Sequence, residues 1–185
     1  MENLVSPLIK VDALQQVGYV VRDADKVMKN MWETFGIGPW DVYVTTEDLM
    51  SKTTYYGKPA KFSFKAAMCQ LSPNGMQIEL IEPLSGDNIY QDHINQFGEG
   101  IQHLGWYKVY SLNAFQETKQ ALEKAGFPCA MGGEMYSNTK ERDYIGTWGY
   151  FDTRKVLNAM LEVLEITSYD PATATNPPTY VYPAK

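Results

Sequence analysis

The chain alternates between stretches in which every second residue is apolar and stretches in which apolar residues recur every three or four positions. The first pattern is typical of half-buried strands and the second of amphipathic helices. Helices are predicted at Ala24 to Phe35, Ile89 to Phe97 and Leu112 to Ala125. Strands are predicted at Leu14 to Arg22, Asp41 to Thr45, Lys61 to Leu71, Met76 to Ile81, His103 to Tyr110, Cys129 to Tyr136, Asp143 to Asp152 and Val156 to Ile166. The order strand, helix and three strands therefore occurs twice along the chain.

The two halves match in residue type as well as in the order of their elements. Gln16 to Tyr19 in the first half and His103 to Trp106 in the second both read polar, aliphatic, glycine, aromatic. Each half also closes on an apolar strand that carries a glutamate, Glu79 in the first and Glu162 in the second. An internal repeat of this kind indicates two copies of one βαβββ unit.

The repeat predicts how the chain is divided. We expect an N-terminal arm at residues 1–13, a first module at 14–84, a linker at 85–100, a second module at 101–167 and a C-terminal tail at 168–185. The tail is rich in proline and has no periodicity, so no regular element is predicted there. The polar stretch from Thr46 to Ala60 is predicted to be a long loop, and long loops in compact domains are often functional. We expect it to cover the mouth of the site as a lid.

Composition is that of an acidic globular protein. Its 185 residues, 44% of them hydrophobic, suffice for a sizeable core. The net charge of -6 argues against a nucleic-acid partner. No apolar run approaches the roughly 18 residues that cross a bilayer, and no signal-peptide pattern opens the chain. Cys69 and Cys129 are too few for a disulfide framework. We expect a cytoplasmic protein without a nucleic-acid or membrane partner.

Four polar residues occupy matching positions on the first and last strands of the two halves: Gln16, Glu79, His103 and Glu162. A carboxylate between aliphatic residues on a strand is costly unless it is paired or bound to a metal. Together the four residues offer oxygen and nitrogen ligands for one divalent ion, and zinc, nickel, cobalt, manganese and iron all suit such a set. The alternative is that both glutamates face solvent on half-exposed strands.

The two-copy pattern resembles the vicinal oxygen chelate superfamily over residues 14–167. That superfamily includes glyoxalase I, methylmalonyl-CoA epimerase, extradiol dioxygenases and bleomycin-resistance proteins. The stretches 78–84, 101–106 and 161–163 are most similar to methylmalonyl-CoA epimerase. The resemblance implies an α+β fold in which two βαβββ modules form a mixed, open β-barrel-like sheet around a metal site, with the helices outside.

The resemblance also implies the ligands. The matching positions in the epimerase bind the metal, which implies Glu79, His103 and Glu162 here. The stretch from Leu14 to Gln16 is similar to animal glyoxalase I, whose metal site is likewise Gln, Glu, His and Glu. Glyoxalase I has a glutathione-binding arginine where this chain has Val20.

The implied activity is that of a metal-dependent isomerase, epimerase or lyase that moves a proton next to the carbonyl of a small acid or CoA thioester. The metal acts as a Lewis acid and a glutamate acts as general base. We assign the base to Glu162, because its neighbours Met160 and Leu164 form an apolar pocket that raises a carboxyl pKa. Glu79, with Gln77 beside it to hold it, is the fixed anion of the catalytic pair.

The predicted substrate cavity is lined by a mainly aromatic set. Lys65 is the nearest polar residue on the strand where the epimerase carries a second catalytic glutamate. The residues expected to contact the substrate are Lys65, Tyr107, Tyr144, Trp148 and Tyr150.

Two other classes of protein stay open from the sequence. A metal-free protein of the same fold that binds a drug-like molecule agrees with the missing epimerase glutamate and the missing arginine. An extradiol dioxygenase needs two histidines and one glutamate on iron, whereas the second histidine, His93, falls in the predicted linker.

We expect the partner to be a small-molecule substrate and the chain to form a homodimer.

Overall fold

The two halves join through β1 (Gln16–Val20) and β7 (Gly100–Val109), the strands that open them, which pair antiparallel. The computed structural model describes residues 6–73, 75–109, 114–166 and 176–184. Pairing continues on both sides of this centre, because β1 pairs parallel with β6 (Gln77–Ser85) and β7 pairs parallel with β10 (Met160–Ile166). The last strand of each half therefore lies beside its first.

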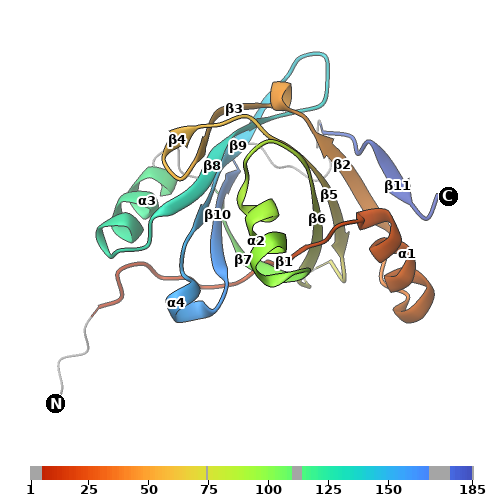
Figure 1. The fold of residues 1–185 in the computed structure, drawn as a ribbon, viewed down its shortest axis with the longest axis horizontal. Coiled ribbons are helices and arrows are strands. Elements are labelled where there is room, and N and C mark those ends of the chain that lie inside the picture. Colours follow the sequence, from red (N-terminus) through yellow and green to blue (C-terminus); the bar gives the residue numbers. More distant parts are fainter. Residues whose placement is uncertain (1–5, 74, 110–113, 167–175, 185) are drawn as a thin grey trace.

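The remaining strands extend the sheet outward from this centre (Figure 1). They are β2 (Trp40–Thr45), β3 (Met50–Tyr55), β4 (Lys58–Pro59), β5 (Ser63–Gln70), β8 (Cys129–Tyr136), β9 (Tyr144–Phe151) and β11 (Tyr180–Tyr182). The described residues form an eleven-stranded sheet in the order β11-β2-β5-β6-β1-β7-β10-β9-β8-β3-β4. The helices are α1 (Ala24–Phe35), α2 (Ile89–Phe97), α3 (Ala114–Lys124), α4 (Arg154–Leu157) and a 3-10 helix at Glu47–Leu49.

The sheet is strongly curved. β2 and β3 lie near opposite ends of the strand order, yet only residues 46–49 connect them. A linker that short spans less than about 20 Å. The two ends of the sheet must therefore curl toward each other, and Figure 1 shows the strands arching around α2. The predicted α+β fold with an open, curved, mixed sheet is confirmed.

α1 forms where the helical periodicity predicts it and covers the convex, outer face of the first half. Asp23 caps its first turn by accepting a hydrogen bond from the Lys26 backbone N–H, and Gly36 ends it in the left-handed conformation. Met28 of α1 is fully buried against Trp40 and neighbouring residues of the sheet. α3 covers the outer face of the second half in the same way. No helix in the described parts of the chain is long and apolar enough to cross a membrane.

α2 differs from the prediction that the helices lie outside, because it packs against the concave, inner face. Ile89, Tyr90 and Ile94 of this helix belong to the inner core and are at most 7% exposed. Asn88 begins the helix by accepting a hydrogen bond from the Gln91 backbone N–H. The apolar side of α2 needs a surface to bury it, and the interior of the curved sheet provides one.

The stretch from Thr46 to Ala60 is not the long loop that was predicted, and its role as a cover of the site stays a prediction. It contains β3 and β4, and β3 pairs antiparallel with β8 at one end of the sheet. The Ser51 hydroxyl on β3 donates a hydrogen bond to Glu134 of β8. The prediction was wrong because a strand near the edge of a sheet, with one face toward solvent, needs few apolar side chains.

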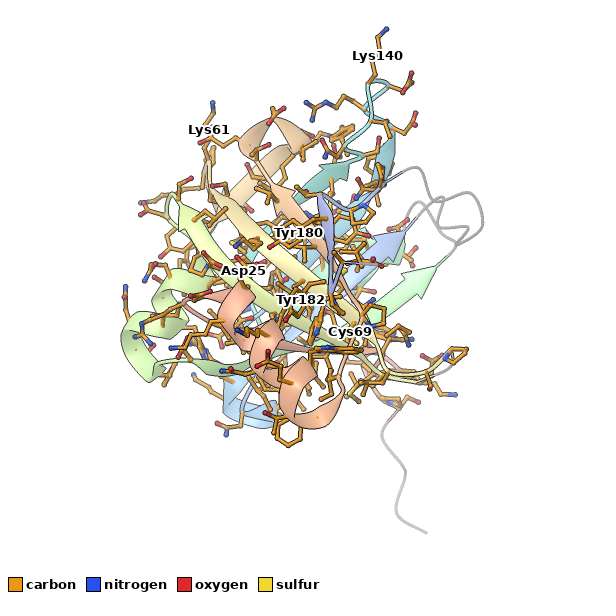
Figure 2. The ribbon with its side chains drawn as sticks, turned by 90° about the vertical axis from the view of Figure 1, so that its right-hand side faces the viewer. Asp25, Lys61, Cys69, Lys140, Tyr180 and Tyr182 are labelled. Carbon is orange, nitrogen blue, oxygen red and sulfur yellow. The ribbon has the colours of Figure 1, made fainter. Side chains whose placement is uncertain are left out.

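Two segments near the C-terminus also differ from the prediction. Residues 154–157 form α4, which ends at Asn158 in the left-handed conformation, so β10 begins only at Met160. In the predicted tail, β11 pairs with β2, and the Tyr180 hydroxyl donates a hydrogen bond to Asp25 of α1. Figure 2 shows this outer face, with Asp25, Tyr180 and Tyr182 together in the centre. Residues 167–175 lie outside the described part of the tail.

Candidate metal centre

Glu79 of β6, His103 of β7 and Glu162 of β10 meet on the inner face of the sheet, and their ligand atoms lie within 4.8 Å of one another. His103 Nε2 is 3.2 Å from Glu79 Oε2 and 3.6 Å from Glu162 Oε2. The three residues are 5%, 0% and 7% exposed, respectively. The alternative in which both glutamates face solvent is therefore wrong.

Gln16 of β1 completes the group of four residues proposed from the sequence. Its Oε1 lies 3.1 Å from His103 Nε2, and its Nε2 donates a hydrogen bond of 2.8 Å to Gln77 Oε1. Because Gln77 takes up the amide N–H, the amide oxygen of Gln16 faces the histidine. The parallel register of β1 and β6, which pairs Gln16 with Gln77 and Gly18 with Glu79, produces this arrangement.

Gly18 lies directly under the imidazole ring. A Cβ atom at this position would come within 1.8 Å of His103 Cε1. The antiparallel pairing of β1 and β7 places Gly18 opposite His103, so the ring occupies the space that a side chain would fill. The glycine of the repeated motif is thus required by the packing of a candidate ligand.

The residues present fit one divalent ion. Oxygen atoms of Gln16, Glu79 and Glu162 all face the Nε2 atom of His103. Buried carboxylates that converge in this way are costly unless protons or a cation lie among them. A set of one imidazole nitrogen and three oxygens suits the borderline divalent metals.

The protonation of these groups reflects their burial. Burial raises the pKa of Glu79 to about 8. Burial, with a smaller contribution from the neighbouring Glu79, raises the pKa of Glu162 to about 7. Burial lowers the pKa of His103, so the imidazole is neutral at neutral pH. Without a cation the site therefore holds protons that a metal would displace.

These shifts predict how the stability of the metal-free protein depends on pH. Between pH 6.5 and 8 the folded chain keeps a carboxyl proton, on Glu79 above all, that the unfolded chain has already released. Stability therefore falls as pH rises through this window. His103, with a lowered pKa, acts in the opposite direction only below its ordinary value near 6.5. We expect the Tm of chelator-treated protein to drop from pH 6.5 to 8.

The same scan with a divalent ion present is the control. A metal binds the deprotonated carboxylates, so the loaded protein should lose less Tm over the same interval. A Tm of the metal-free protein that rises from pH 6.5 to 8 would contradict the assignment of buried, proton-holding glutamates.

Aromatic residues surround the ligand group on the inner face. The Tyr150 ring lies 5.0 Å from the His103 ring, edge to face, and Tyr150 is the residue opposite Glu162 in the pairing of β9 with β10. The Tyr90 hydroxyl donates to the Tyr150 hydroxyl at 3.0 Å. Trp148 is buried beside Tyr150, and its Nε1 has no hydrogen-bond partner among the described residues. Tyr150 therefore lies beside a candidate ligand and Trp148 lies next to Tyr150, and their contact with a substrate stays a prediction.

Two residues near the ligands were missed by the sequence analysis. Tyr90 reaches the site from α2, and nothing in a linker between the repeats indicates that its helix turns inward. Gln102 lies next to His103, and its Oε1 is 2.7 Å from His103 Nδ1. Strict alternation along a strand would have sent the Gln102 side chain to the outer face.

Lys65 does not line the site. It lies on the outer face of β5, where its Nζ is 2.7 Å from Asp25 Oδ2 and 3.2 Å from Glu82 Oε2. The neighbouring residues Phe64 and Ala66 take the inner positions, because side chains alternate along the strand. The expectation that Lys65 contacts the substrate was therefore wrong.

Tyr144 is also away from the site. Its hydroxyl is 2.5 Å from Thr147 Oγ1, and its ring packs against Tyr136. Tyr150 is the residue of β9 that pairs with Glu162. Tyr144 lies at the start of the same strand, and at about 3.4 Å per residue it is roughly 20 Å from Tyr150. The Tyr107 side chain lies outside the described residues. His93 of α2 packs against Phe97 and is not a member of the ligand group.

Comparison with known proteins agrees with this architecture. The family model described as the Glyoxalase/Bleomycin resistance protein/Dioxygenase superfamily matches residues 15–145. No curated protein sequence matches the chain. Methylmalonyl-CoA epimerase from Mycobacterium tuberculosis is similar in structure at 18% identity and a TM-score of 0.57, over 94% of this chain and 98% of that one.

Two further solved structures share the fold. A variant of Streptomyces coelicolor methylmalonyl-CoA epimerase, in complex with 2-nitronate-propionyl-CoA, is 13% identical with a TM-score of 0.58, over 86% of this chain and 100% of that one. A hypothetical protein from Bacillus halodurans is 16% identical with a TM-score of 0.55, over 85% and 96% of the two chains. These identities show a likeness of fold alone, whereas the family model covers most of the sequence. The chain belongs to the Glyoxalase/Bleomycin resistance protein/Dioxygenase superfamily.

Proposed function

We propose that this protein is a metal-dependent isomerase, epimerase or lyase that moves a proton next to a carbonyl of a small acid or CoA thioester. The observation that carries the proposal is the buried group of Gln16, Glu79, His103 and Glu162 around one point. The structural similarity to methylmalonyl-CoA epimerases, one of them with an acyl-CoA analogue bound, supports the same class of substrate.

Gln16, Glu79, His103 and Glu162 would hold the metal. A bound divalent ion acts as a Lewis acid and stabilises negative charge on a substrate oxygen. The chain itself keeps water away from this point, since all four side chains are at most 7% exposed. Exclusion of water strengthens every electrostatic interaction inside the site.

Glu162 is the proposed general base. When its carboxylate is not bound to the metal, burial raises its pKa to about 7, close to the neutral pH at which it has to take and return a proton. Its Oε2 lies 3.6 Å from His103 Nε2, so the carboxylate faces the interior of the site. We assign Glu79, whose Oε2 lies 3.2 Å from His103 Nε2, the role of the fixed anion. Trp148 and Tyr150 are the proposed substrate contacts, together with Tyr107.

The wider setting follows from the same proposal. Cys69 and Cys129 are free thiols, which suits a reducing compartment such as the cytoplasm. We propose a homodimer, and we retain the division into arm, two modules, linker and tail as the expected domain organisation.

Metal analysis joined to isotope exchange tests the function. Purified protein should bind about one equivalent of zinc, nickel, cobalt, manganese or iron(II) per chain. It should then exchange the α-proton of a branched acyl-CoA thioester with deuterated solvent, and a chelator should abolish this exchange. Failure to bind any of these metals between pH 7 and 8 would overturn the proposal and favour the metal-free binding protein of the same fold.

A further inference from the structure

We propose that Gln102 is a positioning residue that holds His103 in the tautomer whose Nε2 is free to bind the metal. This inference rests on the proposed metal centre. It concerns a residue that contacts neither the substrate nor the metal and acts only through His103.

A β-bulge brings Gln102 to the inner face. Gly18 of β1 pairs with His103, whereas the next residue, Tyr19, pairs with Ile101, so Gln102 is the extra residue of β7. A bulge of this kind interrupts the alternation of side chains along the strand. Gln102 and His103 are consequently both buried, at 3% and 0% exposure, and they contact each other.

The contacts of the Gln102 amide set its orientation. Its Oε1 lies 2.7 Å from His103 Nδ1, and its Nε2 donates to Met160 Sδ at 3.2 Å. A thioether sulfur accepts hydrogen bonds weakly and donates none. If the amide were flipped, its oxygen would face the sulfur with no hydrogen between them. The sulfur of Met160 therefore favours the orientation in which the amide oxygen faces the imidazole.

That orientation decides the tautomer of His103. An amide oxygen only accepts, so the contact with Gln102 needs the proton on Nδ1. The Gln16 amide oxygen competes for a proton on Nε2, but at 3.1 Å its contact is longer than the 2.7 Å contact of Gln102 with Nδ1. Nε2 then presents a lone pair to the oxygen atoms of Gln16, Glu79 and Glu162. In the metal-free protein this lone pair accepts the carboxyl proton that burial keeps on the glutamates, and a metal takes the place of that proton. A metal-binding histidine is generally fixed in this way by a partner on its other ring nitrogen. Gln102 thereby prepares the imidazole before a metal arrives.

Two substitutions separate this role from simple packing. Gln102→Leu fills the same space without an acceptor, and Gln102→Glu keeps an acceptor for the Nδ1 proton. Losing the partner on the second ring nitrogen typically costs about 10- to 100-fold in metal affinity. We expect that loss for Gln102→Leu, and an affinity within a few-fold of the unmodified protein for Gln102→Glu. Gln91→Leu is the control, because the Gln91 side chain bonds Asn95 on the exposed side of α2, while its contact with Asn88 uses only the backbone N–H.

Nitrogen NMR of the imidazole supplies a readout that packing alone would not move. The chain has only two histidines, so the His103 signals can be assigned with a His93 variant. Metal-free unmodified protein and Gln102→Glu should show the Nδ1–H tautomer, whereas Gln102→Leu should show a mixture with the Nε2–H form. An unchanged tautomer in folded Gln102→Leu would overturn the inference.

The NMR measurement also keeps the test of this inference separate from the test of the proposed function. If the unmodified protein binds no metal, the proposed function fails, while the NMR comparison still decides whether Gln102 sets the tautomer. Should Gln102→Leu not fold, Met160→Leu replaces it. Loss of the sulfur should then weaken the preference for the Nδ1–H form, and an unchanged preference would count against the mechanism.

Discussion

Replacing Glu162 by glutamine is expected to slow exchange of the substrate α-proton by about 10²-fold or more, while the metal content stays near normal. Glutamine keeps the size of the side chain and a ligating oxygen but removes the base. Burial raises the pKa of Glu162 to about 7 when the carboxylate is not bound to the metal, which suits it to accept a proton near neutral pH. Deuterium incorporation into the substrate and metal analysis of the same sample measure both effects.

Two matched variants give this prediction its controls. Glu79→Gln should reduce metal occupancy first, because it removes the charge that we assign to holding the ion. Lys65→Met should leave both metal content and exchange rate unchanged, since Lys65 bonds Asp25 and Glu82 on the outer face. Its cost should appear in stability, at about 2 kcal/mol for the partly buried charges left without a partner. Proton exchange at the unmodified rate in Glu162→Gln would show that the base is wrongly assigned.

Gly18→Ala is expected to weaken metal binding by about 10²-fold or more, although the substitution adds a single methyl group. The new Cβ would overlap the His103 ring at 1.8 Å from Cε1, so the imidazole must leave its position. Overpacking of this kind also costs roughly 1 to 3 kcal/mol of stability. Titration with zinc or cobalt, followed by calorimetry, measures the affinity, and thermal unfolding measures the stability.

Gly149→Ala is the control for the added methyl group. Its Cβ would meet Phe115 at 2.9 Å and Cys129 at 3.2 Å. Phe115 belongs to the apolar cluster between α3 and the outer face of the sheet, and Cys129 packs against that cluster. It should therefore lower stability without affecting metal affinity. If both alanine variants bound metal as tightly as the unmodified protein, the close packing of His103 on Gly18 would have no role in the site.

The sequence by itself determined much of the architecture and the set of candidate ligands. The periodicity of α1, with Asp23 before it and Gly36 after it, identifies the same residues that form the helix. The repeat led to Gln16, Glu79, His103 and Glu162 because equivalent residues of two paired units lie close together when their first strands join. The periodicity of apolar residues and an internal repeat are both visible in the sequence itself. They can therefore be recognised without knowing which surface each helix or strand packs against.

Only the tertiary structure decided which face several elements present and what surrounds the ligands. α2 turns inward because the curved sheet encloses a surface that buries Ile89, Tyr90 and Ile94. Lys65 faces outward because the register of β5 gives the inner positions to Phe64 and Ala66. The bulge that brings Gln102 beside His103 exists only in the pairing of β7 with β1. Each of these outcomes depends on contacts between segments distant in sequence, and such contacts leave no periodic pattern in either segment alone.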